Sequence, residues 1–384
     1  MAEPFRFVCL DPRKAKRRRI AGVLGQIGEI NRYRLPPLSS RSFPETAARA
    51  EEAMLAARNI PSPGLQRALW LRLLGMQYNG TRALFEKDKA QVAVAWNGLN
   101  GSRRVFMQAA KDAGARTLYF ELGPFPGRIT VDPEGVNFVN VLPRTPDPYL
   151  VWLAKSGCDP AAWRALGALI KQRTPDQPPA PAAGPPPLTE PFIFAPLQVP
   201  GDSQLRVFGG VFRTVESFVK ALAEAAKYLP DGWHLRLKEH PSTPAFVAGL
   251  LKDTNAPIYL DNATDTFAQV AASRGVVTVN SSVGLEAMFF DKPVTACGQC
   301  FWAIPGMAAR APDQAALNDA MAQANAWDYD PDTRNAVMSF LDQVYYPLSD
   351  RETGDAPATS AAKVAARIGA DGDIAKWELA EVPA

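Results

Sequence analysis

Histidine and cysteine are scarce in this chain of 384 residues, which contains two histidines and four cysteines. Cys9 and Cys158 are isolated, whereas Cys297 and Cys300 form a single CxxC pair. A zinc site of the common kind needs a second such pair or nearby histidines, and a disulfide framework needs more cysteines in a shorter chain. We therefore expect no metal site, no cofactor and no disulfide-stabilised fold.

Long apolar runs and a strong charge of one sign are also missing. No stretch approaches the roughly 20 apolar residues of a transmembrane helix. The first apolar run, residues 5–10, is too short for a secretory signal and is followed by basic residues. The net charge of +3 does not indicate a nucleic-acid-binding protein. These absences favour a folded, cytoplasmic protein.

Positive charge is concentrated near the amino terminus, at Arg13, Lys14 and residues 16–19. Such a run is typical of a solvated helix or loop face. It could also attract an anionic substrate or anionic lipid at the cytoplasmic face of the inner membrane. The sequence leaves both interpretations open.

A proline-rich stretch divides the chain. Residues 173–190 are rich in Pro, Ala and Gly and predict an extended linker. The predicted parts are an N-terminal domain (1–172), this linker, a C-terminal domain (191–345) and a helical tail (346–384).

Short β-rich runs alternate with longer amphipathic runs in both halves, which is typical of parallel α/β sheets. We therefore predict an α/β fold with two Rossmann-like domains. The strands expected from this pattern are residues 91–96, 116–120, 192–197, 234–237, 258–260, 275–279 and 294–296.

Two polar loops each follow a predicted strand and precede a predicted helix, at residues 238–242 and 280–286. The carboxyl ends of parallel strands meet at one sheet edge, where open α/β sheets bind ligands. Ser281 and Ser282 open a helix and could hold a phosphate there, or one of them could be a plain helix cap. His240 can donate a hydrogen bond to a phosphate or carboxylate at the same edge.

Two carboxylates also follow predicted strands, Glu121 in the first half and Asp202 in the second. Paired carboxylates serve glycosyl transfer, one as acid or base and one as nucleophile or charge stabiliser. A single carboxylate in such a loop is more often a turn or cap residue. Spacing alone does not decide between these roles.

Taken together, these motifs resemble those of bacterial capsular polysaccharide synthesis proteins, the retaining β-Kdo transferases that use CMP-Kdo. The matching strings occur in the same order as in that family. They are Asn97-Gly98-Leu99, Phe120-Glu121-x-Gly123, Pro126-Gly127, Asp132-Pro133-x-Gly135-Val136-Asn137, Gln198-x-x-x-Asp202-Ser203, Lys238-Glu239-His240-Pro241 and Asn280-Ser281-Ser282-Val283-Gly284-Leu285-Glu286.

The resemblance implies a GT-B-like arrangement with an interdomain cleft and with CMP-β-Kdo as the donor substrate, held mainly by the second domain. It implies that Asp202 is a nucleophile forming a glycosyl–enzyme intermediate and that Glu121 is the acid/base. The donor-binding residues it implies are His240, Pro241, Ser281, Ser282, Lys238, Glu286, Asn280 and Gln198. The residues it places on the acceptor side are Asn97, Gly98, Gly123, Arg128, Asp132 and Asn137.

The implied partners are a nucleotide sugar and a glycan or lipid-linked acceptor, with no nucleic acid. Two other functions stay open on the residues alone. One is another nucleotide-sugar enzyme of GT-B type, sialyltransferase-like or dependent on a UDP-sugar. The other is a non-catalytic factor for capsule assembly or export.

Overall fold

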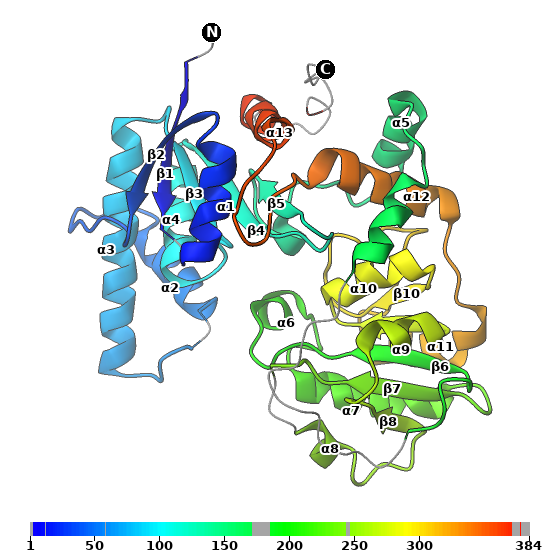
Figure 1. Ribbon diagram of the computed structural model, residues 1–384. Coiled ribbons are helices and arrows are strands. Elements are labelled where there is room, and N and C mark those ends of the chain that lie inside the picture. The colour runs from blue at the N-terminus through cyan, green and yellow to red at the C-terminus, as the bar shows by residue number, and fades with distance from the viewer. Residues whose placement is uncertain are drawn as a thin grey trace. The chain divides into compact units, whose positions relative to one another are not determined.

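The computed structural model describes residues 3–11, 13–57, 59–170, 185–242, 246–370 and 377. The chain forms two compact units (Figure 1). Unit 1 comprises Met1–Leu142 and Leu341–Ala384, and unit 2 comprises Pro143–Phe340. Most of the linker predicted at residues 173–190 lies outside the described residues.

Unit 1 is built on a five-stranded sheet with the order β2-β1-β3-β4-β5. The first four strands pair in parallel and β5 is antiparallel to β4. The strands are β1 (Phe5–Leu10), β2 (Gly28–Tyr33), β3 (Val92–Trp96), β4 (Arg116–Leu122) and β5 (Ile129–Asp132). The helices are α1 (Lys14–Leu24), α2 (Thr46–Leu55), α3 (Leu65–Lys87), α4 (Gly101–Asp112) and α13 (Ala358–Gly369).

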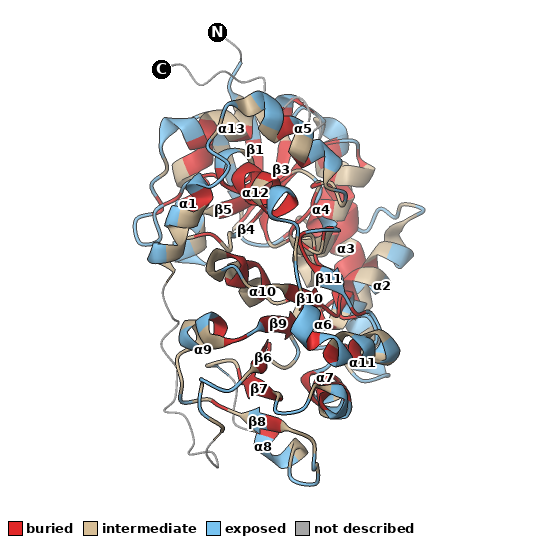
Figure 2. Cartoon of the chain, turned by 90° about the vertical axis from the view of Figure 1, so that its right-hand side faces the viewer, coloured by how far each residue is buried: buried red, intermediate tan, exposed pale blue. Residues whose placement is uncertain are grey.

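Side chains alternate along the strands of unit 1 and so build a core on each face of the sheet. Phe7 and Cys9 of β1 pack with residues of α1 and α13 on one face. Val8 and Leu10 pack with residues of α3 and α4 on the other face. Figure 2 shows the central strands as buried. Burial on both faces is the reason that these strands read as continuous apolar runs.

Unit 2 contains a six-stranded sheet in the order β11-β10-β9-β6-β7-β8, in which all pairings are parallel. The strands are β6 (Phe192–Pro196), β7 (His234–Lys238), β8 (Ile258–Leu260), β9 (Gly275–Thr278), β10 (Val294–Ala296) and β11 (Ala309–Arg310). The helices are α5 (Asp147–Ser156), α6 (Ser203–Phe208), α7 (Val215–Ala225), α8 (Val247–Leu250), α9 (Thr266–Ala272), α10 (Ser282–Glu286), α11 (Gln314–Ala322) and α12 (Pro331–Phe340).

The strand order of unit 2 reverses direction at β6. β7 follows β6 and pairs with one side of it, whereas β9 comes later in the chain and pairs with the other side. A doubly wound sheet binds ligands outside the carboxyl ends of its strands at such a switch point. The loops that leave β6, β7 and β9 therefore meet where a ligand site is expected.

The predicted domain boundary at residue 172 is wrong, because residues 143–170 pack within unit 2. The rings of Tyr149 and Trp152 in α5 lie edge-on to Phe340 of α12, with centroids 5.3 and 5.2 Å apart. The tail that follows α12 belongs to unit 1, and Val364 and Ile368 of α13 complete its core. The contact between α5 and α12 joins segments far apart in sequence, so local patterns did not reveal it.

Among the described residues, no helix combines the length and the apolar character needed to cross a membrane.

Candidate functional site

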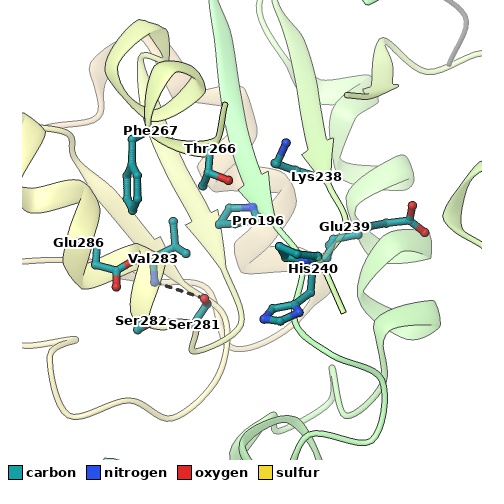
Figure 3. Close-up of a pocket in the computed structure, with 12 residues that line it drawn as sticks. Pro196, Lys238, Glu239, His240, Thr266, Phe267, Ser281, Ser282, Val283 and Glu286 are labelled. Carbon is teal, nitrogen blue, oxygen red and sulfur yellow. Dashed lines mark hydrogen bonds between the residues drawn. The ribbon is translucent and has the colours of Figure 1, made fainter. Parts of the chain in front are cut away.

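A pocket opens at the carboxyl edge of the unit 2 sheet (Figure 3). The loops after β6, β7 and β9 and the first turn of α9 line it. Its lining residues are Pro196, Leu197, Lys238, Glu239, His240, Pro241, Thr266, Phe267, Ser281, Ser282, Val283 and Glu286. The structure thus brings together six of the eight residues predicted to bind the donor.

His240 lies two residues beyond the end of β7 and is followed by Pro241, which cannot donate a strand hydrogen bond. Its Nδ1 accepts a hydrogen bond from the backbone N–H of Ser242 at 3.1 Å. A neutral imidazole that accepts through Nδ1 carries its proton on Nε2 and can donate from there. Figure 3 shows the imidazole and the Ser281 hydroxyl on facing walls of the pocket.

Ser281 is the N-cap of α10, because its hydroxyl oxygen accepts from the backbone N–H of Val283 at 3.2 Å. This confirms the capping interpretation, yet the role uses only the oxygen as an acceptor, and the hydroxyl proton can still be donated. A Cβ added at Gly284 would lie 2.5 Å from the Trp302 ring, so glycine allows α10 to pack closely. Ser282 and Glu286 line the pocket from the same helix.

Lys238 lines the pocket, but its ammonium group is bound to a neighbouring loop. Its Nζ donates to the carbonyl oxygens of Asn262 at 2.8 Å and Thr264 at 2.5 Å. Burial lowers the pKa of this lysine, against the nearby charges of Asp261 and Asp265, which raise it. Lys238 therefore positions the loop between β8 and α9, which carries Thr266 and Phe267 into the pocket.

Glu239 has a similar organising role. Its Oε1 accepts from the backbone N–H groups of Phe246 and Val247, both at 2.9 Å, at the start of α8. Its Oε2 accepts from the Asn262 side chain at 2.7 Å. The side chain thus connects the segment before α8 with the loop after β8.

Gln198 and Asn280, the other two residues predicted to bind the donor, are not among the residues that line the pocket and instead hold its loops together. Gln198 Nε2 donates to Asn280 Oδ1 at 2.9 Å, and both side chains are buried. The Asn280 side-chain amide also donates to the carbonyl oxygen of Gln204 at 3.0 Å. The loop after β9 is therefore fastened to both the loop after β6 and helix α6.

Asp202 is the N-cap of α6. Its Oδ1 accepts from the backbone N–H of Gln204 at 2.9 Å, and Oδ2 makes no hydrogen bond within the described residues. Asp202 is not among the residues that line the pocket, although it leaves the same edge of the same sheet. The cap uses one carboxylate oxygen and leaves the other available for chemistry.

Glu121 lies at the end of β4 in unit 1 within a defined set of hydrogen bonds. Its two carboxylate oxygens accept from Trp96 Nε1 at 2.8 Å and from Asn97 Nδ2 at 2.9 Å. Asn97 and Gly98 both adopt positive φ angles, of 67° and 72°, so the backbone turns sharply after β3. The Lys16 ammonium lies over the Trp96 ring at 5.0 Å.

Two residues predicted on the acceptor side instead have internal roles in unit 1. Asp132 is fully buried and accepts from the backbone N–H groups of Glu134, Gly135 and Val141. Burial raises the pKa of its carboxyl group, and these hydrogen bonds oppose the increase. An inaccessible carboxylate cannot contact an acceptor, so this prediction is wrong.

Arg128 is likewise directed inward, where it pairs with Asp342 and donates to the carbonyl oxygen of Tyr346 at 3.3 Å. Gly123 lies in a tight turn, where its N–H donates to the carbonyl oxygen of Arg128 at 3.0 Å. Asn137 has a φ of 58° at the start of a short 3₁₀ turn. These positions shape the backbone after β4 and β5.

Six lining residues were not among the predicted site residues: Pro196, Leu197, Glu239, Thr266, Phe267 and Val283. Pro196 and Leu197 end a predicted strand, and Thr266 and Phe267 open a predicted helix. If every residue at the end of a predicted strand and at the start of the next helix in the second half had been counted as a site residue, these residues would have been predicted.

Within the described residues, no three histidine, cysteine, aspartate or glutamate side chains are grouped in a way that could hold a metal ion.

The two doubly wound units define the fold as GT-B-like, with two Rossmann-like domains. A solved structure with a similar fold is the Thermosulfurimonas dismutans KpsC β-Kdo 2,7 transferase, with a TM-score of 0.55 and 16% identity over 92% of this chain and 95% of that chain. The β-Kdo 2,4 transferase of KpsC from the same organism has a TM-score of 0.50 and 13% identity over 93% and 96% of the two chains.

Residues 181–336 match the family model described as capsule polysaccharide biosynthesis protein. The match lies within unit 2. It is similar to Protein FixF of Sinorhizobium fredii, with 30% identity over 66% of the chain and 60% of FixF. It is also similar to the capsule polysaccharide modification protein LipB of Neisseria meningitidis, with 26% identity over 30% of each protein. The chain thus spans less than two thirds of the length of both relatives.

Proposed function

We propose that the chain is a glycosyltransferase that transfers Kdo from CMP-β-Kdo to a glycan or lipid-linked acceptor with retention of configuration. The observation that carries the proposal is the pocket of unit 2, where His240 and the Ser281–Ser282 pair face one another at the switch point of the sheet. The match of residues 181–336 to the capsule polysaccharide biosynthesis family model and the fold shared with the KpsC transferases support it.

The donor phosphate is the group that these side chains suit. His240 donates from Nε2, and the hydroxyls of Ser281 and Ser282 donate from the opposite wall. Donors placed around a leaving phosphate stabilise the charge that develops on it as the glycosidic bond breaks. This arrangement lets CMP leave without requiring a metal ion. Lys238 and Glu239 act indirectly, by positioning the loops.

In the first proposed step, Asp202 Oδ2 attacks the anomeric carbon of Kdo. The bond from that carbon to the phosphate oxygen breaks, and its electron pair leaves with CMP. The product is a Kdo ester of Asp202, formed with inversion at the anomeric carbon.

In the second step, an acceptor hydroxyl attacks the same carbon while Glu121 takes its proton. The bond to Asp202 breaks, and the carboxylate regains its electron pair. Two inversions give net retention. Asn97 and the Trp96 indole hold the Glu121 carboxylate in one orientation, as a proton-transfer group requires.

Nucleotide binding tests the donor half of the proposal. Only two histidine side chains exist, so the imidazole NMR signals of His240 and His234 can be followed separately during titration with CMP, UMP and UDP. We expect CMP to shift the His240 signal and to leave that of His234, at the opposite end of β7, unchanged. A preference for a uridine nucleotide would indicate a UDP-sugar enzyme. If no nucleotide binds, a non-catalytic role in capsule assembly is favoured.

A further inference from the structure

The first turns of α3 expose four large apolar side chains to solvent. Leu65, Leu69, Trp70 and Leu73 are 77%, 56%, 37% and 43% exposed, and we refer to them as the α3 patch. Buried residues of this helix begin only at Leu74. Figure 1 shows the amino-terminal half of α3 extending past the strands of the unit 1 sheet. A cluster of this size on a projecting helix marks an interaction surface.

The charge around the α3 patch is mainly positive. Residues 53–85 contain four arginines and no aspartate or glutamate. Arg72, which is exposed, has no ion pair among the described residues. Arg67 is only loosely paired, with 3.8 Å between its Nη2 and Glu51 Oε1. Glu51 of α2 also lines the groove together with Arg72, so two arginines and one acid border the apolar side chains. Apolar side chains bordered by net positive charge are complementary to an anionic surface that has an apolar interior.

The patch continues into a groove between α2 and α3. Leu65, Leu69, Arg72 and Met76 follow one another at steps of four, three and four residues, so they form one stripe along the helix. Arg72 and Met76 also line the groove, whose far wall includes Thr46 and Ala50 of α2. The stripe thus leads from exposed leucines past a cation into a recess.

The basic cluster near the amino terminus is a weaker membrane-binding candidate than its sequence indicated. Arg17 forms an ion pair with Asp11 at 2.6 Å, and Lys16 lies over the Trp96 ring. Arg18 and Arg19 donate to backbone carbonyl oxygens at 3.0 and 2.9 Å. Four of the six cations in this cluster are therefore engaged in contacts within unit 1.

We propose that the α3 patch is a docking surface for an anionic membrane. Its leucines and Trp70 enter the boundary between headgroups and acyl chains, and Arg67 and Arg72 contact lipid phosphates. Tryptophan is favoured at that depth because its ring is apolar and its N–H is polar. The proposal goes beyond the transferase function, and its test requires no turnover.

Co-sedimentation of the full chain with vesicles tests the proposal. The vesicles contain phosphatidylcholine alone or with about a third phosphatidylglycerol, and the binding is repeated at high salt. The test variant is Leu69→Glu/Leu73→Glu, and the control is Val151→Glu on α5, which is also exposed. A third variant, Arg13→Glu/Lys14→Glu, probes the basic cluster. All of these positions are exposed, so the variants should fold, as melting curves can verify.

We expect wild-type protein to bind the anionic vesicles and salt to weaken this binding. Binding should fall by about tenfold or more in the Leu69/Leu73 variant, because two apolar anchors become charged. Arg72→Gln should reduce it about fivefold. Val151→Glu should bind as wild type does. The proposal is overturned if the wild-type protein binds neither kind of vesicle, or if only the Arg13→Glu/Lys14→Glu variant loses binding. If the protein self-associates through the α3 patch and does not bind vesicles, the membrane proposal is overturned, and the patch binds a second copy of the chain instead.

Discussion

The Gln198 side chain donates from Nε2 to Asn280 Oδ1 at 2.9 Å, across the pairing of β6 with β9. The two residues are 82 positions apart, and this contact aligns the exit loops of the two strands. One loop leads to Asp202 and the other to Ser281. A buried amide pair of this kind stabilises only if both members are present, because removing either member leaves the amide atom of the other that forms this bond without its partner.

Asn280→Leu should therefore lower the free energy of unfolding by about 1–3 kcal/mol, since it leaves the buried Gln198 amide without its partner. Urea unfolding measures this change. Gln198→Leu should have a similar effect, and the double variant should cost less than the two single changes added together. Strict additivity would show that the pair is not coupled.

The pairing of these loops could not be predicted from sequence, although the strands themselves were. Five of the six strands of unit 2 are short apolar runs between polar loops, so their positions were predicted to within a residue, whereas the exposed strand β11 was not predicted. Which strands are neighbours depends on the order β9-β6-β7, which local patterns do not encode. The contact between Gln198 and Asn280 follows only from that order.

Unit 1 was less predictable because its sheet has a poorly marked edge. β2 (Gly28–Tyr33) is partly exposed along its whole length and contains one large aliphatic residue, Ile30. It therefore lacks the apolar signal that identified β3. The role of Asp132 was also hidden, because the sequence cannot show that Tyr345, 213 residues later, donates to its carboxylate at 2.9 Å.

His234 should make folding sensitive to mild acid. It lies buried between Phe192 and Tyr259, and this burial, together with the charge of Arg236, lowers its pKa to about 4. The unfolded chain takes up this proton near pH 6.5, before the folded chain does, so stability decreases as the pH falls from about 6.5 to about 4. The loss between pH 7 and pH 5 should be about 1–2 kcal/mol.

Urea unfolding at the two pH values checks this effect in wild type, His234→Phe and His240→Gln. The His234→Phe variant should lose most of the pH dependence, and the other variant should keep it. An unchanged dependence in His234→Phe would assign the effect to carboxyl groups instead.

The CxxC pair should be unreactive in the folded protein. Cys297 and Cys300 are buried, and burial raises the pKa of both thiols, to about 12 for Cys300. Burial also raises the pKa of Cys9 to about 12. Because thiolates are the reactive form, a thiol reagent at pH 8 should modify only the partly exposed Cys158 before denaturation and all four cysteines after it. Rapid labelling of native Cys158→Ser would contradict this prediction.

Asp202→Asn separates the chemical role of this residue from its structural one. Asparagine caps helices about as well as aspartate, so α6 should stay intact and the melting temperature should change little. Transfer of Kdo from CMP-Kdo should fall by about a thousandfold or more, because the amide is not a nucleophile. Asp202→Ala is the comparison, and it should lose both the cap and activity. Near-normal turnover by Asp202→Asn would exclude the proposed nucleophile.

The most direct test of the central claim is intact-protein mass spectrometry of Glu121→Gln incubated with freshly generated CMP-Kdo. This variant keeps Asp202 and the donor pocket but lacks the base for the acceptor hydroxyl, so the covalent intermediate should accumulate. The account predicts a mass increase of one Kdo residue, located on Asp202 and absent when Asp202→Asn is added. The absence of an adduct in Glu121→Gln, or an adduct that persists after Asp202→Asn, would contradict it.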